Sequence, residues 1–297
     1  MSSLLQHLFT GLSVGAIYAL VALGYTMVFG VLQLINFAHG DIVMIGAFVA
    51  YYAAKWTGAQ PSWGFAAGAL VVSMAVSAAL GFVIERAAYR PLRHQARITA
   101  LITAIGVSLL LENGGQLLFG ADPKAPLWTP NLAPIRLGGV SIQPLEMLAL
   151  GLALGIMAML RFIVFRTRFG LAMRAVAHDA KVASLMGINT DRVISLTFML
   201  GSALAAAAGM LYSLMYPKID PFMGLQPGLK AFIAAVLGGI GNVPGAMLGG
   251  VVLGLSEEFV AGYVSSSLRD AFAFVLLITV LLFRPTGLLG SRAIEKV

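Results

Sequence analysis

The sequence predicts an all-α fold: a polytopic bundle of about eight membrane-embedded helices with broken or re-entrant segments. Hydrophobic residues make up 59% of the 297 residues and charged residues only 10%, and the mean hydropathy is +0.92. A soluble domain carries about a quarter charged residues, so this composition indicates a membrane protein. The apolar runs are continuous and about 20 residues long, which favours spanning helices over the alternating strands of a barrel. No part resembles a separate soluble domain, so residues 1–297 are expected to form a single transmembrane domain.

Eight apolar segments follow one another along the chain. The first lies in a stretch without the basic region of a signal peptide, so we expect a retained membrane helix. The longest polar loop, residues 120–144, is rich in Pro and Gly and contains one Lys and one Arg. It is predicted to be external. The apolar segments are Leu12–Leu34, Ile42–Tyr52, Phe65–Ile84, Ile98–Phe119, Leu145–Phe165, Val193–Tyr212, Leu229–Leu255 and Ala261–Phe283.

Basic residues mark the side of the membrane that is predicted to face the cytoplasm. Thirteen of the nineteen Lys and Arg residues lie just beyond apolar runs. This placement follows the positive-inside rule, so we assign the net charge of +7 to orientation in membrane lipid and expect no nucleic acid partner. Four lie in residues 86–97, six in residues 161–192, and the last three are Arg284, Arg292 and Lys296.

The run Leu229–Leu255 conflicts with a single crossing, because one crossing would leave the basic tail outside. Its middle reads GGIGNVPG, which contains four Gly and one Pro, a density that no straight helix tolerates. The sequence therefore predicts a broken helix over residues 229–255 that enters and leaves on the same side. Irregular backbone at membrane depth is tolerated where it lines a cavity, so we name Gly238, Gly241, Asn242 and Gly245 as candidates for the substrate pathway or gate.

The motif NFAHGD, residues 36–41, interrupts the N-terminal half in the same way. A pair of Gly-interrupted segments, one in each half, is typical of a transport pathway. The alternative is a tight turn in which Asp41 caps the following helix. On the first interpretation Asn36, His39 and Asp41 belong to the pathway.

Further polar residues occur within or beside apolar runs. Glu112 and Asn113 interrupt the fourth run near its predicted outer end. Glu112 either lines the outer mouth of a pathway or extends its side chain to the interface. Glu257 and Glu258 are expected to be solvated near the outer side.

The segment Gly170–Val193 is polar and lies between two long apolar runs. Read as one helix, it has a stripe of small apolar residues and a face of basic residues. A membrane subunit presents a helix of this kind to a soluble partner, whereas the alternative is a connecting helix with a solvated face. The stripe contains Met173, Val176, Ala177, Ala180 and Ala183, and Arg174, His178 and Lys181 line the other face.

Several chemistries are not supported by the sequence. The chain has no Cys, and its four His residues lack metal-ligand spacing, so no metal or other cofactor is expected. The Gly-rich stretch 238–245 is not followed by Lys-Ser or Lys-Thr, so it is not a phosphate-binding P-loop. Neither an ATP-hydrolysing site nor a catalytic triad is present, and we expect a transport protein and not an enzyme.

Three stretches carry a resemblance to a known family: NFAHGDIVMIGAF from Asn36, the segment Gly170–Val193, and LKAFIAAVLGGIGNVPGAMLGG from Leu229. From about Leu8 to the RPTGLLG motif, the chain resembles the LivH-type permease of bacterial branched-chain amino acid ABC importers, a multi-pass protein of the inner membrane. The resemblance implies a LivM-type second permease, two cytoplasmic ATPases that bind the ATP, and a periplasmic amino-acid-binding protein.

The resemblance also implies that the polar segment is the coupling helix of the importer. The usual leading Glu-Ala-Ala is replaced here by Arg174-Ala175-Val176, and the later proline is missing. Because of this departure, the resemblance does not fix the docking contacts of Arg174, His178 and Asp179, but it does fix the location of the coupling helix. The residues to which ATPase coupling is assigned are Arg174, Ala175, His178, Asp179, Ala183 and Gly187.

The predicted function is translocation of branched-chain amino acids, driven by the partner ATPases. The binding protein is expected to dock on residues 120–144 and 212–227. Relatives within the resemblance carry urea, short amides or other amino acids. From the residues alone there are three alternatives. An ion-coupled secondary transporter would bury more ionisable residues than the sequence indicates. An intramembrane enzyme would need a nucleophile and a base that the sequence does not bring together, and a neutral channel would not explain the amphipathic segment.

Overall fold

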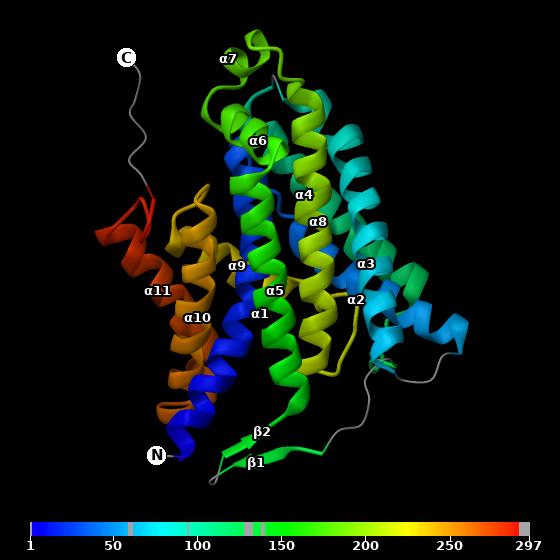
Figure 1. Cartoon of the computed structure of the whole chain (residues 1–297), viewed down its shortest axis with the longest axis vertical. Coiled ribbons are helices and arrows are strands. Elements are labelled where there is room, and N and C mark those ends of the chain that lie inside the picture. The colour runs from blue at the N-terminus through cyan, green and yellow to red at the C-terminus, as the bar shows by residue number, and fades with distance from the viewer. Residues whose placement is uncertain (1, 59–61, 94, 128–132, 138–139, 291–297) are drawn as a thin grey trace.

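The computed structural model describes residues 2–58, 62–93, 95–127, 133–137 and 140–290, which form a polytopic helix bundle (Figure 1). The predicted fold class is confirmed, with a short antiparallel hairpin added in the external loop. The described helices are α1 (Ser2–Leu32), α2 (His39–Thr57), α3 (Trp63–Ile84), α4 (Arg97–Phe119), α5 (Pro144–Arg166), α6 (Arg168–His178), α7 (Ala180–Leu185), α8 (Thr190–Met215), α9 (Leu225–Gly238), α10 (Val243–Tyr263) and α11 (Arg269–Phe283). The shorter elements are the π-helix η1 (Glu85–Tyr89), the 3₁₀-helices η2 (Arg90–Leu92) and η3 (Ser266–Leu268), and strands β1 (Ile135–Leu137) and β2 (Val140–Ile142).

Helices α1 and α8 form the centre of the bundle. In the most apolar stretch of each helix, 89% of residues are buried in α1 and 78% in α8, against 22% in α4 and 6% in α11. The described residues contain seven helices that are long and apolar enough to cross a membrane. Helices α2 and α9 are not among them, and both pack inside the bundle. The sequence predicted about eight membrane-embedded helices. The described residues form seven helices that can span the membrane, together with the interior helices α2 and α9.

Small residues bring the central helices into close contact. A Cβ added at Gly15 of α1 would lie 2.9 Å from the carbonyl oxygen of Gly250 in α10. Where α2 crosses α8, a Cβ at Gly46 would overlap the backbone of Ala206. Close backbone packing of this kind is typical of helices in lipid, because the hydrophobic effect does not drive helices together there and van der Waals contacts do.

The chain turns back into the bundle after α1 and again after α8. As a result α2 and α9 both begin in the interior, where Gly40 packs against Gly224 and Gly228. The irregular backbone that precedes these two helices is found in residues 33–38 and 216–224.

Helices α9 and α10 form an antiparallel hairpin, in which Gly238 packs on Gly245 and Ala234 on Gly249. Helix α10 ends at the same end of the bundle as α8 (Figure 1), so the prediction that this run enters and leaves on one side is confirmed. The prediction of two half-helices is wrong in one respect. Helix α10 has 21 residues and is long enough to span the membrane, whereas α9 has 14. The Gly-rich break is therefore the turn that joins a short helix to a full-length one.

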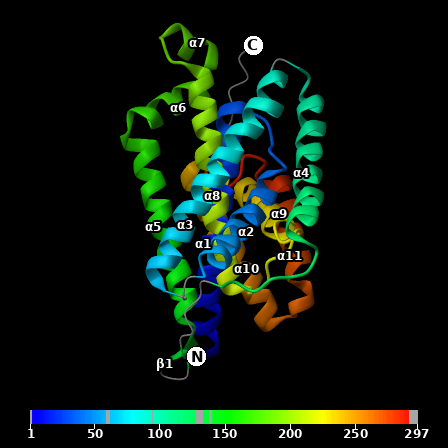
Figure 2. The ribbon, with the colours of Figure 1, turned by 90° about the vertical axis from the view of Figure 1, so that its right-hand side faces the viewer.

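The two ends of the bundle differ in charge. Helices α6 and α7 and the end of the described chain lie at one end, and the N-terminus of α1 and the hairpin β1–β2 lie at the other (Figures 1 and 2). The arginine-rich segments 86–93 and 166–192 are at the α6–α7 end, which is the cytoplasmic end by the positive-inside rule. Arg292 and Lys296 lie outside the described residues.

Candidate translocation path and coupling segment

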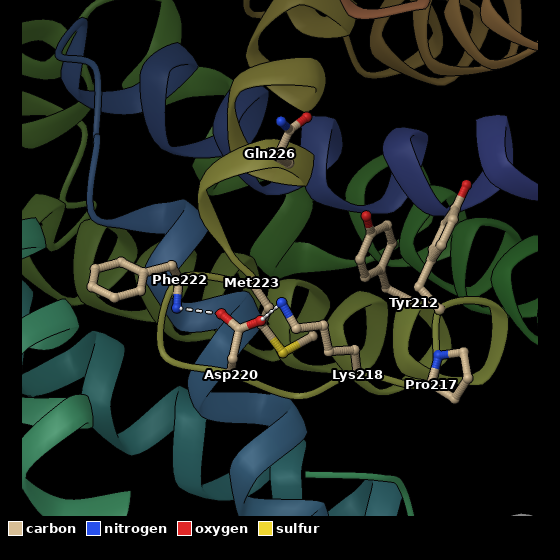
Figure 3. A pocket seen from close by; sticks show the side chains of 8 residues that line it. Tyr212, Pro217, Lys218, Asp220, Phe222, Met223 and Gln226 are labelled. Atoms are coloured by element: carbon tan, nitrogen blue, oxygen red, sulfur yellow. Dashed lines mark hydrogen bonds and ion pairs between the residues drawn. The ribbon is translucent and has the colours of Figure 1, made fainter. Parts of the chain in front are cut away.

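Helix α9 and the loop before it line cavities at three depths of the bundle. The outer cavity has a volume of about 540 Å³ and is lined by Tyr212, Tyr216, Phe222 and Met223, with Gln226 of α9 at its edge (Figure 3). Its lining is mainly aromatic and aliphatic, which suits an apolar side chain.

The outer cavity also contains a surface ion pair. Lys218 and Asp220 lie 3.0 Å apart (Figure 3). Nearby, the backbone amides and carbonyls of Lys124 and Ile219 exchange two hydrogen bonds of 2.8 Å. The two loops that were predicted to receive a binding protein, residues 120–144 and 212–227, are therefore joined beside this cavity.

The middle pocket lies where the N-termini of α2 and α9 meet. It has a volume of about 160 Å³, and Gly40, Gly224 and Gly228 form part of its wall. Asp41 lines it and accepts a hydrogen bond of 2.5 Å from the Ser108 hydroxyl of α4. The alternative in which Asp41 caps α2 is wrong, because the carboxylate is bound by Ser108 and the N-cap position is held by Ala38 without a side-chain bond.

Glu112 extends the Asp41 cluster along α4. Its side chain is buried and is close enough to Asp41 to interact with it electrostatically. This differs from the interpretation in which Glu112 reaches the interface, because the side chain lies inside the bundle. Asn113 is exposed, and its side-chain amide donates to the carbonyl of Leu109 on the same helix at 2.7 Å.

His39 and Asn36 hold the break between α1 and α2. The Nε2 atom of His39 lies 3.2 Å from the carbonyl oxygen of Val21. Asn36 accepts a hydrogen bond of 2.9 Å from the Tyr89 hydroxyl of η1. Neither side chain lines the three cavities. Their assignment to the pathway stays a prediction, and the geometry shows them fixing the backbone that carries Asp41.

The inner cavity is the largest, at about 1050 Å³, and it lies at the cytoplasmic end. Its lining includes Gly30 of α1, Gly241 and Asn242 of the hairpin, and Arg174 and His178 of α6. The cavity is thus shared between the hairpin and the predicted coupling segment.

An aromatic cluster connects the linings of the inner cavity and the middle pocket. Phe232 of α9 lines the inner cavity, whereas Tyr25 and Phe37 line the middle pocket. The ring centroid of Phe232 is 6.2 Å from that of Tyr25 and 6.5 Å from that of Phe37. The three rings therefore pack together where the two linings meet, and they are the candidate barrier between the two spaces.

The four hairpin residues named from the sequence make the turn itself. Gly241 has a φ of +92°, which favours glycine. Asn242 caps α10 by accepting from the Gly245 amide at 2.9 Å, and its side-chain amide donates to Leu289 of the tail at 2.6 Å. Gly238 packs on Gly245. These residues lie apart from Asp41, so the two predicted clusters are at different depths and do not form one site.

A buried ionic cluster was not found from the sequence. Lys230 of α9 donates to Glu257 of α10 at 2.9 Å and pairs with Asp270 at 2.8 Å. Tyr18 of α1 also donates to Glu257 at 3.2 Å, and Arg269 pairs with Glu257 at 3.3 Å. The expectation that Glu257 is solvated is wrong, because these donors hold it in the interior at 0% exposure. The sequence contained one signal for this cluster, because Lys230 is an ionisable residue inside an apolar run.

The cytoplasmic segment folds as two helices, α6 and α7, and not as one. The chain breaks at Asp179, whose carboxylate accepts from the backbone amides of Lys181 and Val182 at 2.9 and 3.0 Å. An Asp at an N-cap offers the backbone this alternative to a continuous helix. Ala183 is buried, and Gly187, with a φ of +84°, ends the turn.

The surface of α7 is more apolar than a solvated connecting helix requires. Val182, Leu185 and Met186 are 54%, 87% and 78% exposed. Large exposed apolar side chains on a polar segment mark an interaction surface. These three residues were missed because the sequence was read as one continuous helix with a stripe of small side chains. Arg174 and His178 are exposed but line the inner cavity, so their contact with a partner stays a prediction.

The chain matches a family model over most of its length. The profile of the family described as "Branched-chain amino acid transport system / permease component" matches residues 7–281. A solved structure titled "PsaBC from Streptococcus pneumoniae in complex with Fab" covers 96% of this chain and 91% of its own, with 13% identity and a TM-score of 0.46.

Two relatives are similar over nearly their whole length. The high-affinity branched-chain amino acid transport system permease protein LivH of Escherichia coli (strain K12) is 45% identical over 99% of this chain and 97% of its own. The corresponding permease protein BraD of Pseudomonas aeruginosa is 45% identical over 99% of this chain and 98% of its own. The chain is a multi-pass protein of the inner membrane, and it belongs to the branched-chain amino acid transport permease family of ABC importers.

Proposed function

We propose that this chain is the permease subunit through which an ABC importer moves branched-chain amino acids into the cell. The observation that carries the proposal is the 45% identity, over 99% of the chain, to permeases named for that transport. The mainly apolar lining of the outer cavity fits a substrate with an aliphatic side chain.

The proposed path follows α9 from the outer cavity to the inner one. In the middle pocket the N-termini of α2 and α9 meet at Gly40 and Gly224, and their partial positive charge favours the carboxylate of an amino acid. Asp41 offers the opposite charge to its ammonium group. Movement of α9 then carries Phe232 out of the aromatic barrier and opens the way to the inner cavity.

The proposed partners are a LivM-type second permease, two cytoplasmic ATPases and a periplasmic amino-acid-binding protein. The ATPases bind the ATP, and this chain contributes no nucleotide site. The exposed apolar surface of α7 supports docking of a soluble subunit at the cytoplasmic end.

The test is reconstitution of the permease pair in liposomes with the binding protein outside the vesicles and the ATPases inside them. We expect accumulation of leucine that requires ATP enclosed in the vesicles, with isoleucine and valine competing and urea not competing. Accumulation by this chain alone under a proton or sodium gradient contradicts the proposal and favours a secondary transporter. Competition by urea or short amides assigns the importer to another substrate class.

The docking surface gives a direct prediction. Leu185→Asp with Met186→Asp is expected to abolish co-purification of the ATPases, because two charges would replace the apolar contact. Folding is expected to be unaffected, since both side chains are largely exposed. Gln95→Asp, an exposed position in another cytoplasmic loop, is the charge control. Retention of the ATPases by the double variant would show that α7 does not dock them.

The aromatic barrier gives a second prediction. Phe232→Ala removes the ring that separates the middle pocket from the inner cavity, so preloaded liposomes are expected to lose leucine several-fold faster without ATP. The control is Phe274→Ala on the outer helix α11, where the ring is 48% exposed. Equal leak rates in wild type and Phe232→Ala place the barrier elsewhere.

A further inference from the structure

Helices α3 and α8 pack side by side (Figures 1 and 2). A groove lies between their cytoplasmic ends. Its volume is about 420 Å³, and none of its residues lines the three cavities of the path. The groove is therefore separate from the proposed path of the transported substrate. Its lining is Phe82, Arg86, Arg90, Asn189, Asp191, Arg192, Ser195, Leu196 and Met199.

The groove carries two positive charges without a counter-charge from the neighbouring acids. Asp191 pairs with Arg90 and with Arg93, and Arg93 also pairs with the buried Glu85. These two acids and two arginines balance one another. Within the described part of the chain no ion pair involves Arg86 or Arg192, and both are exposed.

The other half of the groove is apolar and faces the membrane. Phe82 lies in the span Trp63–Leu92, and Leu196 and Met199 lie in the span Thr190–Met215. From Arg192 to Met199 the helix rises by about 10 Å, at about 1.5 Å per residue, so the groove runs from the charged level into the hydrocarbon region. The Arg86 guanidinium lies 5.9 Å from the centroid of the Phe82 ring, at the boundary of the two halves.

We propose that this groove binds an anionic phospholipid of the cytoplasmic leaflet. Arg86 and Arg192 hold the phosphate of the headgroup, and Phe82, Leu196 and Met199 contact the first part of an acyl chain. Basic pockets between helices on the cytoplasmic side are suited to such headgroups. A soluble partner with an acidic surface would match the arginines, but it could not cover the apolar half, which lies within the two spans.

The lipid holds together the end of α3 and the start of α8, the helix that follows the coupling segment. Arg86 belongs to η1, a π-helical turn, and Arg192 follows Asn189, which caps α8 directly after α7. A phosphate between these arginines links the end of α3 to the start of α8. The bound lipid is thereby a structural cofactor of the cytoplasmic end and is distinct from the transported substrate.

The experiment uses the full-length permease with its partner subunits in nanodiscs of phosphatidylethanolamine and phosphatidylglycerol. Native mass spectrometry after detergent extraction measures the phosphatidylglycerol that each complex retains. A basic residue that faces an anionic headgroup contributes about fivefold in affinity, so Arg86→Gln with Arg192→Gln is expected to lower the affinity of the groove roughly 25-fold.

The matched control is Arg166→Gln with Arg168→Gln, which removes two exposed cytoplasmic charges outside the groove. The control is expected to retain phosphatidylglycerol as wild type does, and size-exclusion profiles confirm that both double variants assemble. Equal loss in the two double variants shows a general charge effect and overturns the proposal. Cross-linking of positions 86 and 192 to an ATPase subunit overturns it as well, because the groove would then be covered by protein.

Discussion

Replacing Lys230 with methionine is expected to lower the stability of the folded permease by about 3–5 kcal/mol, because it leaves Glu257 buried without its main counter-charge. The Lys230 ammonium lies 2.9 Å from Glu257, whose side chain is 0% exposed. Lys230 also ties the re-entrant helix α9 to α10 and, through Glu257, to Tyr18 of α1. Thermal unfolding of the detergent-solubilised complex measures the loss, and uptake is expected to fall with it.

The chain supplies a matched control for this variant. Lys218 and Asp220 form an ion pair of nearly the same length, 3.0 Å, but the Lys218 side chain is 66% exposed. Lys218→Met is expected to cost at most about 1 kcal/mol, as surface pairs do. In Lys230→Met with Glu257→Gln, the buried charge is removed as well, so part of the stability is expected to return. Equal effects of Lys230→Met and Lys218→Met would show that burial does not strengthen the Lys230 pair.

Replacing Gly209 with leucine is expected to abolish transport and to destabilise the fold by about 3 kcal/mol, at the upper end of overpacking. A Cβ at this position of α8 would overlap the carbonyl oxygen of Val43 and lie 3.2 Å from its Cα. Since these are backbone atoms in the first turns of α2, no side chain can rotate away. Helix α2 must shift, and with it the nearby Asp41 of the middle pocket.

The control for Gly209→Leu is Gly68→Leu on α3. A Cβ at Gly68 meets nothing within 4 Å, so the same substitution in an open helical position is expected to leave unfolding temperature and uptake close to wild type. Leucine uptake and thermal unfolding are measured for both variants. If Gly209→Leu transports at the wild-type rate, the crossing of α2 and α8 does not position the path.

The helical membrane class was predictable because it depends on composition and on the length of apolar runs, which are local properties. The re-entrant hairpin was predictable for the same reason. Gly and Pro at residues 238–245 exclude a straight helix. The basic tail ends in the cytoplasm only if the run Leu229–Leu255 returns to the side from which it enters. The position of the turn between α9 and α10 was not predictable. It depends on where α9 begins, and that start is set by the packing of Gly224 on Gly40.

The polar contacts were not predictable, because their partners lie far apart in the sequence. Asp41 finds Ser108 on α4, 67 residues away, so the sequence alone favoured a local cap. Lys230 and Glu257 are 27 residues apart and meet only because the hairpin is antiparallel. The exposed Leu185 and Met186 were hidden for a different reason, since Asp179 starts a new helix and changes which side chains share a face.

The contact between the tail and the hairpin has a consequence for biosynthesis. The backbone amides of Leu288 and Leu289 donate to the carbonyls of Leu237 and Gly238, at 2.8 and 3.0 Å. These carbonyls end α9 and lack partners within the helix. Leu288 and Leu289 follow α11 in the sequence, so the re-entrant hairpin is completed only after α11 has been synthesised. A polypeptide that stops before Leu288 therefore leaves the last carbonyls of α9 without these partners.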